Sequence, residues 1–188
     1  MIRRIAQKDP EAFKEFVERY QALVYSVCLN LLHDHPQAQD VSQEVFLQVY
    51  RSAAKFRFES KASTWLYRIA VNYSLNLIRH NRRSRWLLSL SPYEAEDDPK
   101  IRILPDARSA PPDKAFEDAE RSELVRRAVA ALPDKQRAAL VLHKYEGFTS
   151  REIAEILGIP LTAVEARLRR AKSHLRQKFL AYLKSERT

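Results

Sequence analysis

The scarcity of glycine is the feature that most limits what this chain can fold into. Only two glycines, Gly147 and Gly158, occur among 188 residues, where about 13 would be ordinary. Hairpin turns depend on glycine for their left-handed positions, so a sheet of hairpins is disfavoured. Phosphate-binding loops of the Gly-x-Gly-x-x-Gly and Walker types cannot be written either. We therefore expect an all-α protein.

The prolines divide the chain in two. Five of the nine prolines lie within residues 89–116, which also carry six acidic against four basic residues. Both flanks are basic and have helical periodicity. We expect a helical domain at residues 1–88, a flexible Pro-rich acidic linker at 89–116 and a second helical domain at 117–188. Such a linker permits both compact and open arrangements. Helices are expected at 10–33, 37–54, 64–83, 113–131, 134–146, 149–157 and 161–183.

Charge and cysteine content narrow the possible partners. Lys and Arg number 33 against 24 Asp and Glu, a net charge of +9, which favours an anionic partner such as nucleic acid. The single cysteine, Cys28, allows no internal disulfide and fits a reducing compartment. We expect it in the core.

No apolar run is long enough to cross a membrane, and the N-terminus lacks the apolar core of a secretion signal.

A helix-turn-helix is indicated near the C-terminus. Thr149 and Glu152 have capping-box spacing, Gly158 supplies a turn, and Pro160 precedes a basic helix. This order predicts binding in a major groove; the alternative is a helical hairpin with a solvated basic face. Glu165 either caps this helix with Thr162 or points at DNA, where it could accept from a cytosine amino group.

The predicted helix at 64–83 has two distinct faces. Leu66, Ala70, Tyr73 and Leu77 should face the core. The other face carries an aromatic, two asparagines and two arginines: Trp65, Arg68, Asn72, Asn76 and Arg79. Trp can stack on unpaired bases and Asn can bond base edges, so this face is suited to single-stranded or melted DNA. The preceding loop, with Lys61 and Ser63, could hold a displaced base. The alternative is a half-buried Trp65 beside merely solvated asparagines.

The predicted helix at 37–54 carries an acidic and amide face. Asp40, Gln43, Glu44 and Leu47 follow helical spacing, with Phe46 to their side. This face either docks a protein partner or is simply solvated. Changing Glu44 or Phe46 is expected to weaken docking and leave the fold intact.

The sequence contains no signature of a catalytic or metal centre. Residues 33–35 (HDH) lie at a helix end and lack obvious further ligands. No nucleophile motif or paired metal carboxylates stand out. We expect no enzyme activity, cofactor or metal.

The order of these elements resembles a bacterial sigma factor of the extracytoplasmic-function (ECF) type. The specific matches are residues 40–46 (DVSQEVF), 64–72 (TWLYRIAVN) and 132–137 (LPDKQR), the last running on to 149–172. The resemblance implies a subunit that binds core RNA polymerase, directs it to promoters and helps open the strands. It also implies a cytoplasmic location, no membrane insertion and control by an anti-sigma factor.

The resemblance implies roles for three groups of residues. Docking on the polymerase clamp, in the largest subunit, falls to Asp40, Gln43, Glu44, Phe46 and Leu47. Melting of the minus-ten element and capture of the non-template strand fall to Phe56, Lys61, Ser63, Trp65, Arg68, Asn72, Asn76, Arg79, Arg82 and Arg83. Reading of the duplex minus-thirty-five element falls to Ser150, Arg151, Thr162, Glu165, Ala166, Arg167, Arg169, Arg170 and Lys172. The second domain is also expected to contact the polymerase flap, in the second subunit.

Two departures and two rivals remain. Glu165 and Ala166 stand where many members have a basic residue and a serine, and Pro160 replaces a frequent capping residue. Both departures affect which minus-thirty-five sequence is expected to be recognised, and neither affects the expected fold. One rival is a free-standing helix-turn-helix regulator, which leaves the acidic face unexplained. The other is a DNA-processing enzyme, which would need a nucleophile or metal carboxylates.

Overall fold

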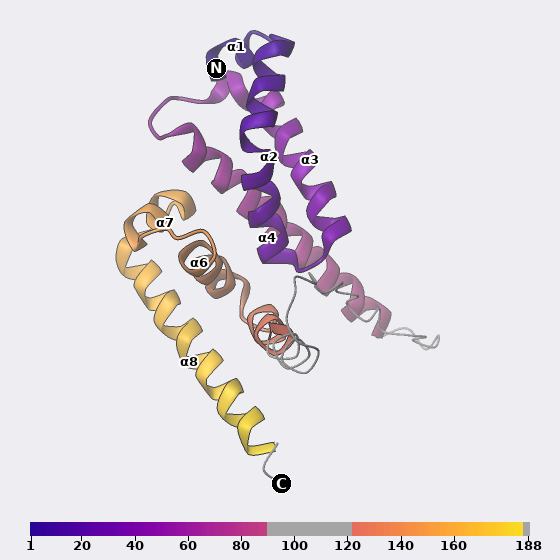
Figure 1. Cartoon of the computed structure of the whole chain (residues 1–188), viewed down its shortest axis with the longest axis vertical. Coiled ribbons are helices and arrows are strands. Elements are labelled where there is room, and N and C mark those ends of the chain that lie inside the picture. The colour runs from indigo at the N-terminus through magenta and orange to yellow at the C-terminus, as the bar shows by residue number, and fades with distance from the viewer. Residues whose placement is uncertain (90–121, 186–188) are drawn as a thin grey trace, which may run out of the picture.

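The computed structural model describes residues 1–89 and 122–185, and within them every regular element is a helix, as predicted (Figure 1). The first half, residues 1–89, contains α1 (Ile2–Ala6), α2 (Pro10–Leu32), α3 (His35–Ser52), the 3-10 turn η1 (Ala53–Lys55) and α4 (Ala62–Ser89). The second half, residues 122–185, contains a helical segment at 122–130, α6 (Asp134–Lys144), α7 (Ser150–Leu157) and α8 (Leu161–Ser185). The fold class is therefore all-α, with two helical domains.

Local capping explains where the helices of the first half begin. The Asp9 carboxylate accepts hydrogen bonds from the backbone amides of Glu11 and Ala12 at 3.0 and 3.1 Å, and it opens α2. Asp34 does the same for α3 through the amide of Gln37, at 2.8 Å. The predicted start at 37 was therefore late, because Pro36 is tolerated in the first turn of a helix.

Two other helix predictions differ from the structure. The short helix α1 was missed; Ile2 and Ile5 anchor it by burying their side chains in the core. Helix α4 begins at Ala62 and continues to Ser89, beyond the predicted end at 83, since no glycine or proline interrupts it. Ser89, where the predicted linker begins, is still part of α4. The rest of that linker, 90–116, and the predicted helix start at 113 lie outside the described residues.

The core of the first half lies between α2, α3 and α4. Phe16, Leu31, Val45 and Leu66 are almost fully removed from solvent. Cys28 is also fully buried, as predicted, and burial raises the pKa of its thiol. The thiol is therefore a packing group held in its neutral form.

The two halves pack against each other, and their buried side chains form one continuous hydrophobic cluster. Helix α6 contacts α2 and α4, and α7 contacts α4. Helix α8 packs on α6 and α7 and runs along the side of the second half away from α2 (Figure 1). The structure thus shows the compact arrangement of the two that the sequence permitted.

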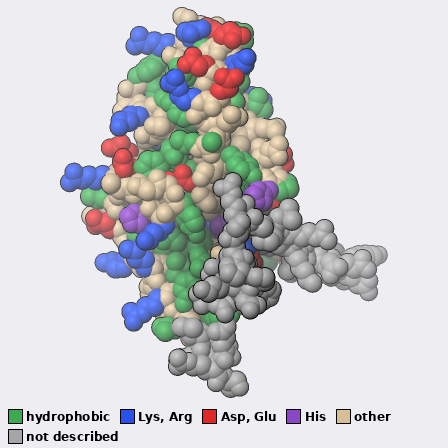
Figure 2. Space-filling model, in the orientation of Figure 1, with side chains coloured by type: hydrophobic (Ala, Val, Ile, Leu, Met, Phe, Trp, Pro, Cys, Tyr) green, Lys and Arg blue, Asp and Glu red, His purple; other side chains and the backbone are tan. Residues whose placement is uncertain are grey.

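The surface carries basic side chains along one edge. Figure 2 shows Lys and Arg side chains spread along the edge that α8 occupies in Figure 1. None of the helices in the described ranges is long and apolar enough to cross a membrane.

Candidate nucleic-acid interface

Helix α4 presents its two faces as predicted. Leu66 and Ala70 are fully buried, and Tyr73 and Leu77 pack partly buried against the core. The polar side chains of the other face are exposed: Arg68, Asn72, Asn76 and Arg79, with Arg82 and Arg83 further along the helix. Asn76 accepts a hydrogen bond from Arg79 at 2.9 Å, so the two groups are ordered as a pair. This face can bond anions and base edges.

An aromatic cluster marks the start of α4. The Phe56 ring lies 4.8 Å from the Trp65 ring and 4.8 Å from the Phe58 ring, measured between centroids. Trp65 is half-buried, which is one of the two alternatives that the sequence left open. Phe58 was missed by the sequence analysis, although its side chain is 52% exposed and its φ is +58°.

A positive φ on a bulky residue is uncommon and calls attention to a functional role. The guanidinium of Arg3 lies over the exposed Phe58 ring, 5.1 Å from the ring centroid. The signal for it in the sequence was an aromatic between two charged residues in a predicted loop. Phe58 and Trp65 each contact the Phe56 ring, and aromatic rings are groups on which an unpaired base can stack. Lys61 is exposed, and Ser63 lies inside the first turn of α4 and not in the loop.

The acidic face of α3 is accessible. Asp40, Gln43 and Glu44 are exposed, and Leu47 is 43% exposed on the same side. Phe46, in contrast, is 8% exposed, and its ring meets that of Phe16 edge-on at 6.3 Å. The exposed part of this face therefore consists of the other four side chains, and Phe46 lies in the core beneath them.

The helix-turn-helix has the local geometry predicted for it. Thr149 Oγ1 accepts from the amide of Glu152 at 3.3 Å, and Glu152 Oε2 accepts from the amide of Thr149 at 2.9 Å. The carboxylate, ligated in this way by the backbone and side chain of Thr149, has a lowered pKa. Gly158 then turns the chain with a φ of +64°. Helix α8 follows from Leu161.

The residue at which α8 begins excludes the capping role considered for Glu165. Because α8 begins at Leu161, Thr162 lies within its first turn and Glu165 lies beyond the capping-box position. Glu165 is exposed. Val164, Leu168 and Ala171 are buried and fix the helix on its neighbours. The opposite side carries exposed Arg169, Arg170 and Lys172 and partly buried Ala166 and Arg167; Thr162 and Arg151 are exposed and Ser150 partly buried.

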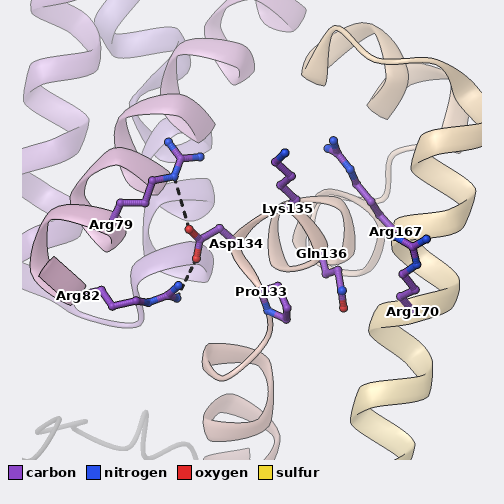
Figure 3. Close-up of a pocket in the computed structure, with 8 residues that line it drawn as sticks. All are labelled: Arg79, Arg82, Pro133, Asp134, Lys135, Gln136, Arg167 and Arg170. Carbon is purple, nitrogen blue, oxygen red and sulfur yellow. Dashed lines mark hydrogen bonds and ion pairs between the residues drawn. The ribbon is translucent and has the colours of Figure 1, made fainter. Parts of the chain in front are cut away.

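A basic hollow of about 360 Å³ lies where the two halves meet. Arg79 and Arg82 enter it from α4, Lys135 from α6, and Arg167 and Arg170 from α8 (Figure 3). The Asp134 carboxylate forms ion pairs with two of these arginines. It lies 2.9 Å from a terminal nitrogen of Arg82 and 3.5 Å from Nε of Arg79. Arginines that the sequence assigned to two different DNA elements thus line one hollow.

The HDH segment is used structurally. Asp34 caps α3, and a ring nitrogen of His35 is 2.7 Å from the hydroxyl of Tyr25. His33 ends α2 in the left-handed conformation, with its ring partly buried. In the described part of the chain, no three His, Cys, Asp or Glu side chains gather in a way that would hold a metal.

Comparisons with known proteins agree on one family. The family model of Sigma-70 region 2 matches residues 16–84, and that of Sigma-70 region 4 matches residues 122–175. The RNA polymerase sigma-H factor of Pseudomonas aeruginosa is 32% identical over 92% of this chain and 88% of its own length. The ECF RNA polymerase sigma factor SigW of Bacillus subtilis is 31% identical over 94% of this chain and 93% of its own.

Solved structures support the same fold. CnrH, in complex with the cytosolic domain of CnrY, superimposes with a TM-score of 0.64 and 20% identity over 96% of this chain and 95% of that one. The sigma factor RpoE of Bartonella quintana, in complex with the anti-sigma factor NepR, gives 0.63 and 20% over 90% and 97%. With full-length relatives above 30% identity and both conserved regions in place, this chain belongs to the ECF group of sigma-70 family RNA polymerase sigma factors.

Proposed function

We propose that the chain is a promoter-specificity subunit whose work is divided among three surfaces. The exposed face of α3 docks on core RNA polymerase, the polar face of α4 opens the minus-ten element, and α8 reads the minus-thirty-five duplex. Polymerase carries out the chemistry, and the chain itself catalyses nothing. The observation that carries the proposal is the arrangement of α4, where a cluster of aromatic rings lies at the start of the helix and exposed Asn72 and Asn76 follow further along it.

The acidic face of α3 is suited to a basic protein partner and not to DNA. Asp40 and Glu44 lie one turn apart and are exposed, with the apolar Leu47 beside them. An interface of this kind combines a charged rim with an apolar contact. We assign it to the clamp of the largest polymerase subunit, and the second half to the flap of the second subunit.

The α4 face is suited to single-stranded DNA. Stacking on Trp65 or Phe58 is worth about 1–3 kcal/mol per base and tolerates any base. The amide groups of Asn72 and Asn76 can then select bases through donor and acceptor pairs. A duplex keeps its bases stacked, so these contacts favour the melted non-template strand.

Helix α8 is suited to a duplex. Arg169, Arg170 and Lys172 are exposed on one side of it, behind the N-terminal residues that would meet base edges. Glu165, exposed in the second turn, is the residue we expect to set base preference there.

We further propose that an anti-sigma factor controls the chain in the bacterial cytoplasm. The support is that RpoE, a sigma factor of the same fold, was solved in complex with the anti-sigma factor NepR. CnrH, which also shares the fold, was solved in complex with the cytosolic domain of CnrY.

The test is run-off transcription with core RNA polymerase and a genomic fragment library, with and without the chain. Discrete transcripts that need the chain are expected, and their upstream sequences give the promoter. Tight duplex binding by the chain alone, with no chain-dependent transcript, would instead support a free-standing regulator.

Two variant pairs separate the surfaces. Glu44→Lys is expected to reduce polymerase binding, whereas Glu18→Lys, an equal charge change on exposed α2, is not. Asn72→Ala is expected to spare polymerase binding and reduce open complexes, scored by permanganate reactivity of unpaired thymines; Gln21→Ala serves as its control. If Glu44→Lys and Asn72→Ala failed at the same step, the division of labour would be wrong.

A further inference from the structure

The basic hollow between the halves carries more positive charge than its own wall balances. Its net charge is +4, because five cations and one carboxylate line it: Arg79, Arg82, Lys135, Arg167 and Arg170 against Asp134. Figure 3 shows the cations entering from α4 on one side and from α8 on the other, with the start of α6 between them. Like charges gathered in a concave site repel one another and attract anions. The hollow is therefore suited to an anionic ligand.

The Asp134 carboxylate satisfies only part of the α4 side of the hollow. It lies 2.9 Å from a terminal nitrogen of Arg82 and 3.5 Å from Nε of Arg79. The side chains of Arg79 and Arg82 are nevertheless 51% and 59% exposed. A guanidinium has five N–H donors, and one shared carboxylate uses only some of them. Both arginines therefore keep donors for a second anion.

The cations on the other side of the hollow have no carboxylate at all. Within residues 1–89 and 122–185, no acidic side chain pairs with Lys135, Arg167 or Arg170. Helix α6 begins in the same wall, and its N-cap, Pro133, provides no side-chain cap for the amides of the first turn. Those amides add partial positive charge at the same place. The excess positive charge is thus concentrated on α6 and α8.

The charge and shape of the hollow favour a chain of phosphate groups. A single terminal phosphate carries about −1.5 to −2 charges at neutral pH, so one such group leaves much of the +4 unbalanced. Two or three linked phosphate groups supply the missing charge, and guanidinium groups bind their oxygens in bidentate geometry. A DNA duplex presents its phosphates on a convex surface, which a hollow between three helices does not admit. The sequence offers no glycine-rich phosphate loop, so side chains must do the binding.

We propose that this hollow is a binding site for an oligophosphate, a linear chain of two or more phosphate groups, and that both halves of the molecule contribute to it. Its ligands are the five cations of the wall, and Asp134 competes with it for the two arginines of α4. The site itself does not depend on the proposed function. One consequence does: four of these cations are the arginines assigned to promoter DNA, so oligophosphate and DNA compete for them.

The phosphate chain can belong to a free inorganic oligophosphate or to a nucleotide. A second hollow, also of about 360 Å³, shares Arg79 and Arg82 with the first and is lined besides by Arg83 and Trp86. The Trp86 side chain is 63% exposed. An exposed indole is a group on which a base can stack. Substitution of Trp86 therefore tells the two sources apart.

The test is isothermal titration calorimetry of the full chain with inorganic tripolyphosphate, at fixed ionic strength and without divalent cations. One site per chain is expected. Arg82→Ala and Arg170→Ala, one from each half, should each weaken binding about tenfold or more, because each removes charge-assisted bonds. Arg176→Ala makes the same charge change at an exposed position of α8 outside the hollow, and it should leave the affinity nearly unchanged. Circular dichroism checks that every variant is folded.

Asp134→Asn should change the affinity in the opposite direction. It removes the carboxylate that competes for Arg79 and Arg82, so tripolyphosphate should bind several-fold more tightly. Glu18→Gln, an equal charge change on exposed α2, should leave the affinity unchanged. Orthophosphate, which carries a single phosphate group, should bind far more weakly than tripolyphosphate to the wild-type chain.

ATP distinguishes the two sources of the phosphate chain. If ATP binds more tightly than tripolyphosphate and Trp86→Ala removes the difference, the ligand is a nucleotide. If ATP binds no more tightly, it is the inorganic chain.

Three results would overturn the site: no binding at millimolar tripolyphosphate, equal losses in Arg170→Ala and Arg176→Ala, or orthophosphate binding as tightly as tripolyphosphate. A loss confined to the arginine of one half would overturn the sharing of the site between the halves. None of these measurements uses DNA or polymerase, so a failure of the sigma-factor proposal shows up separately in the run-off assay.

Discussion

The guanidinium of Arg137, in α6, donates to the backbone carbonyl of Leu31 in the last turn of α2, 3.4 Å away. Arg137 is 5% exposed, and it also donates to the carbonyls of Ala130 and Leu132. Carbonyls at the end of a helix have no partner within the helix. One buried cation therefore satisfies carbonyls from both halves of the molecule.

Replacing Arg137 by Ala should be strongly destabilising. It leaves three buried or partly buried carbonyls without this donor, and we expect a loss of about 2–4 kcal/mol in the free energy of unfolding. Urea denaturation followed by circular dichroism measures it. Lys135→Ala, on the exposed side of the same helix, should change that free energy by less than about 0.5 kcal/mol. Equal effects of the two substitutions would show that the Arg137 bonds contribute nothing.

Substitutions of Phe46 and Glu44 should affect different properties, the first the stability of the fold and the second polymerase binding. Phe46→Ala removes a buried ring that packs against Phe16, and it should cost about 3–5 kcal/mol of stability. This burial makes the expectation that Phe46 can be changed with the fold intact untenable. Glu44→Ala should leave the melting temperature nearly unchanged and weaken polymerase binding, measured by competition for core enzyme. A Phe46→Ala variant as stable as wild type would contradict the packing described.

His33 should make stability depend on pH. Burial, with Arg137 and Arg126 nearby, lowers the pKa of His33 to about 4 from an ordinary 6.5. The unfolded chain therefore binds a proton that the folded chain refuses. Stability from this group is complete above pH 6.5 and is lost as the pH falls toward 4, by about 2 kcal/mol between pH 7 and 5.

Denaturation of His33→Asn across that range should show a shallower pH dependence. Asn tolerates the left-handed backbone of this position, where φ is +56°. His174→Asn, an exposed histidine of α8, should keep the wild-type slope. If His33→Asn kept it too, the source of the dependence would lie elsewhere.

Arg169 should contribute to binding through phosphate. In holoenzyme, Arg169→Ala should weaken binding to minus-thirty-five duplexes of any sequence and reduce the slope of log affinity against log salt by about 1. A titration at several salt concentrations measures it. Lys178→Ala, further along α8, should leave the slope unchanged. A loss restricted to one promoter sequence would mean that Arg169 reads bases.

Local patterns made much of this fold predictable. The capping box at Thr149, the turn at Gly158 and the core stripe of α4 each follow from side chains within a few residues of one another. Helix α1 was missed because five residues give too short a period, and packing of Ile2 and Ile5 supplies what local propensity does not. Spacing alone placed Phe46 beside the acidic face of α3, whereas packing against Phe16 of α2 buries its ring.

The interface between the halves had no signal in the sequence. The Glu146 carboxylate accepts hydrogen bonds from the hydroxyls of Ser26 and Tyr67, which lie 120 and 79 residues away in the chain. Ser26 and Tyr67 are ordinary residues of α2 and α4, and Glu146 is an ordinary residue of the loop after α6. Only the tertiary arrangement brings the three together, so this interface and the basic hollow between the halves could not be read from local spacing. The exposed ring of Phe58 was overlooked for a similar reason, since the spacing of residues in the sequence does not predict its left-handed backbone conformation.

The long separation of these bonds has a consequence for how the molecule is made. Helices form from neighbours in the chain, whereas joining residues more than a hundred positions apart must first overcome the entropy of closing a long loop. Refolding should therefore show helical signal early and the Glu146 contacts last. A newly synthesised chain then passes through an interval in which both halves are folded but have not yet docked. During that interval the polar groups that meet between the halves are solvated, and the rate of docking sets how long the interval lasts.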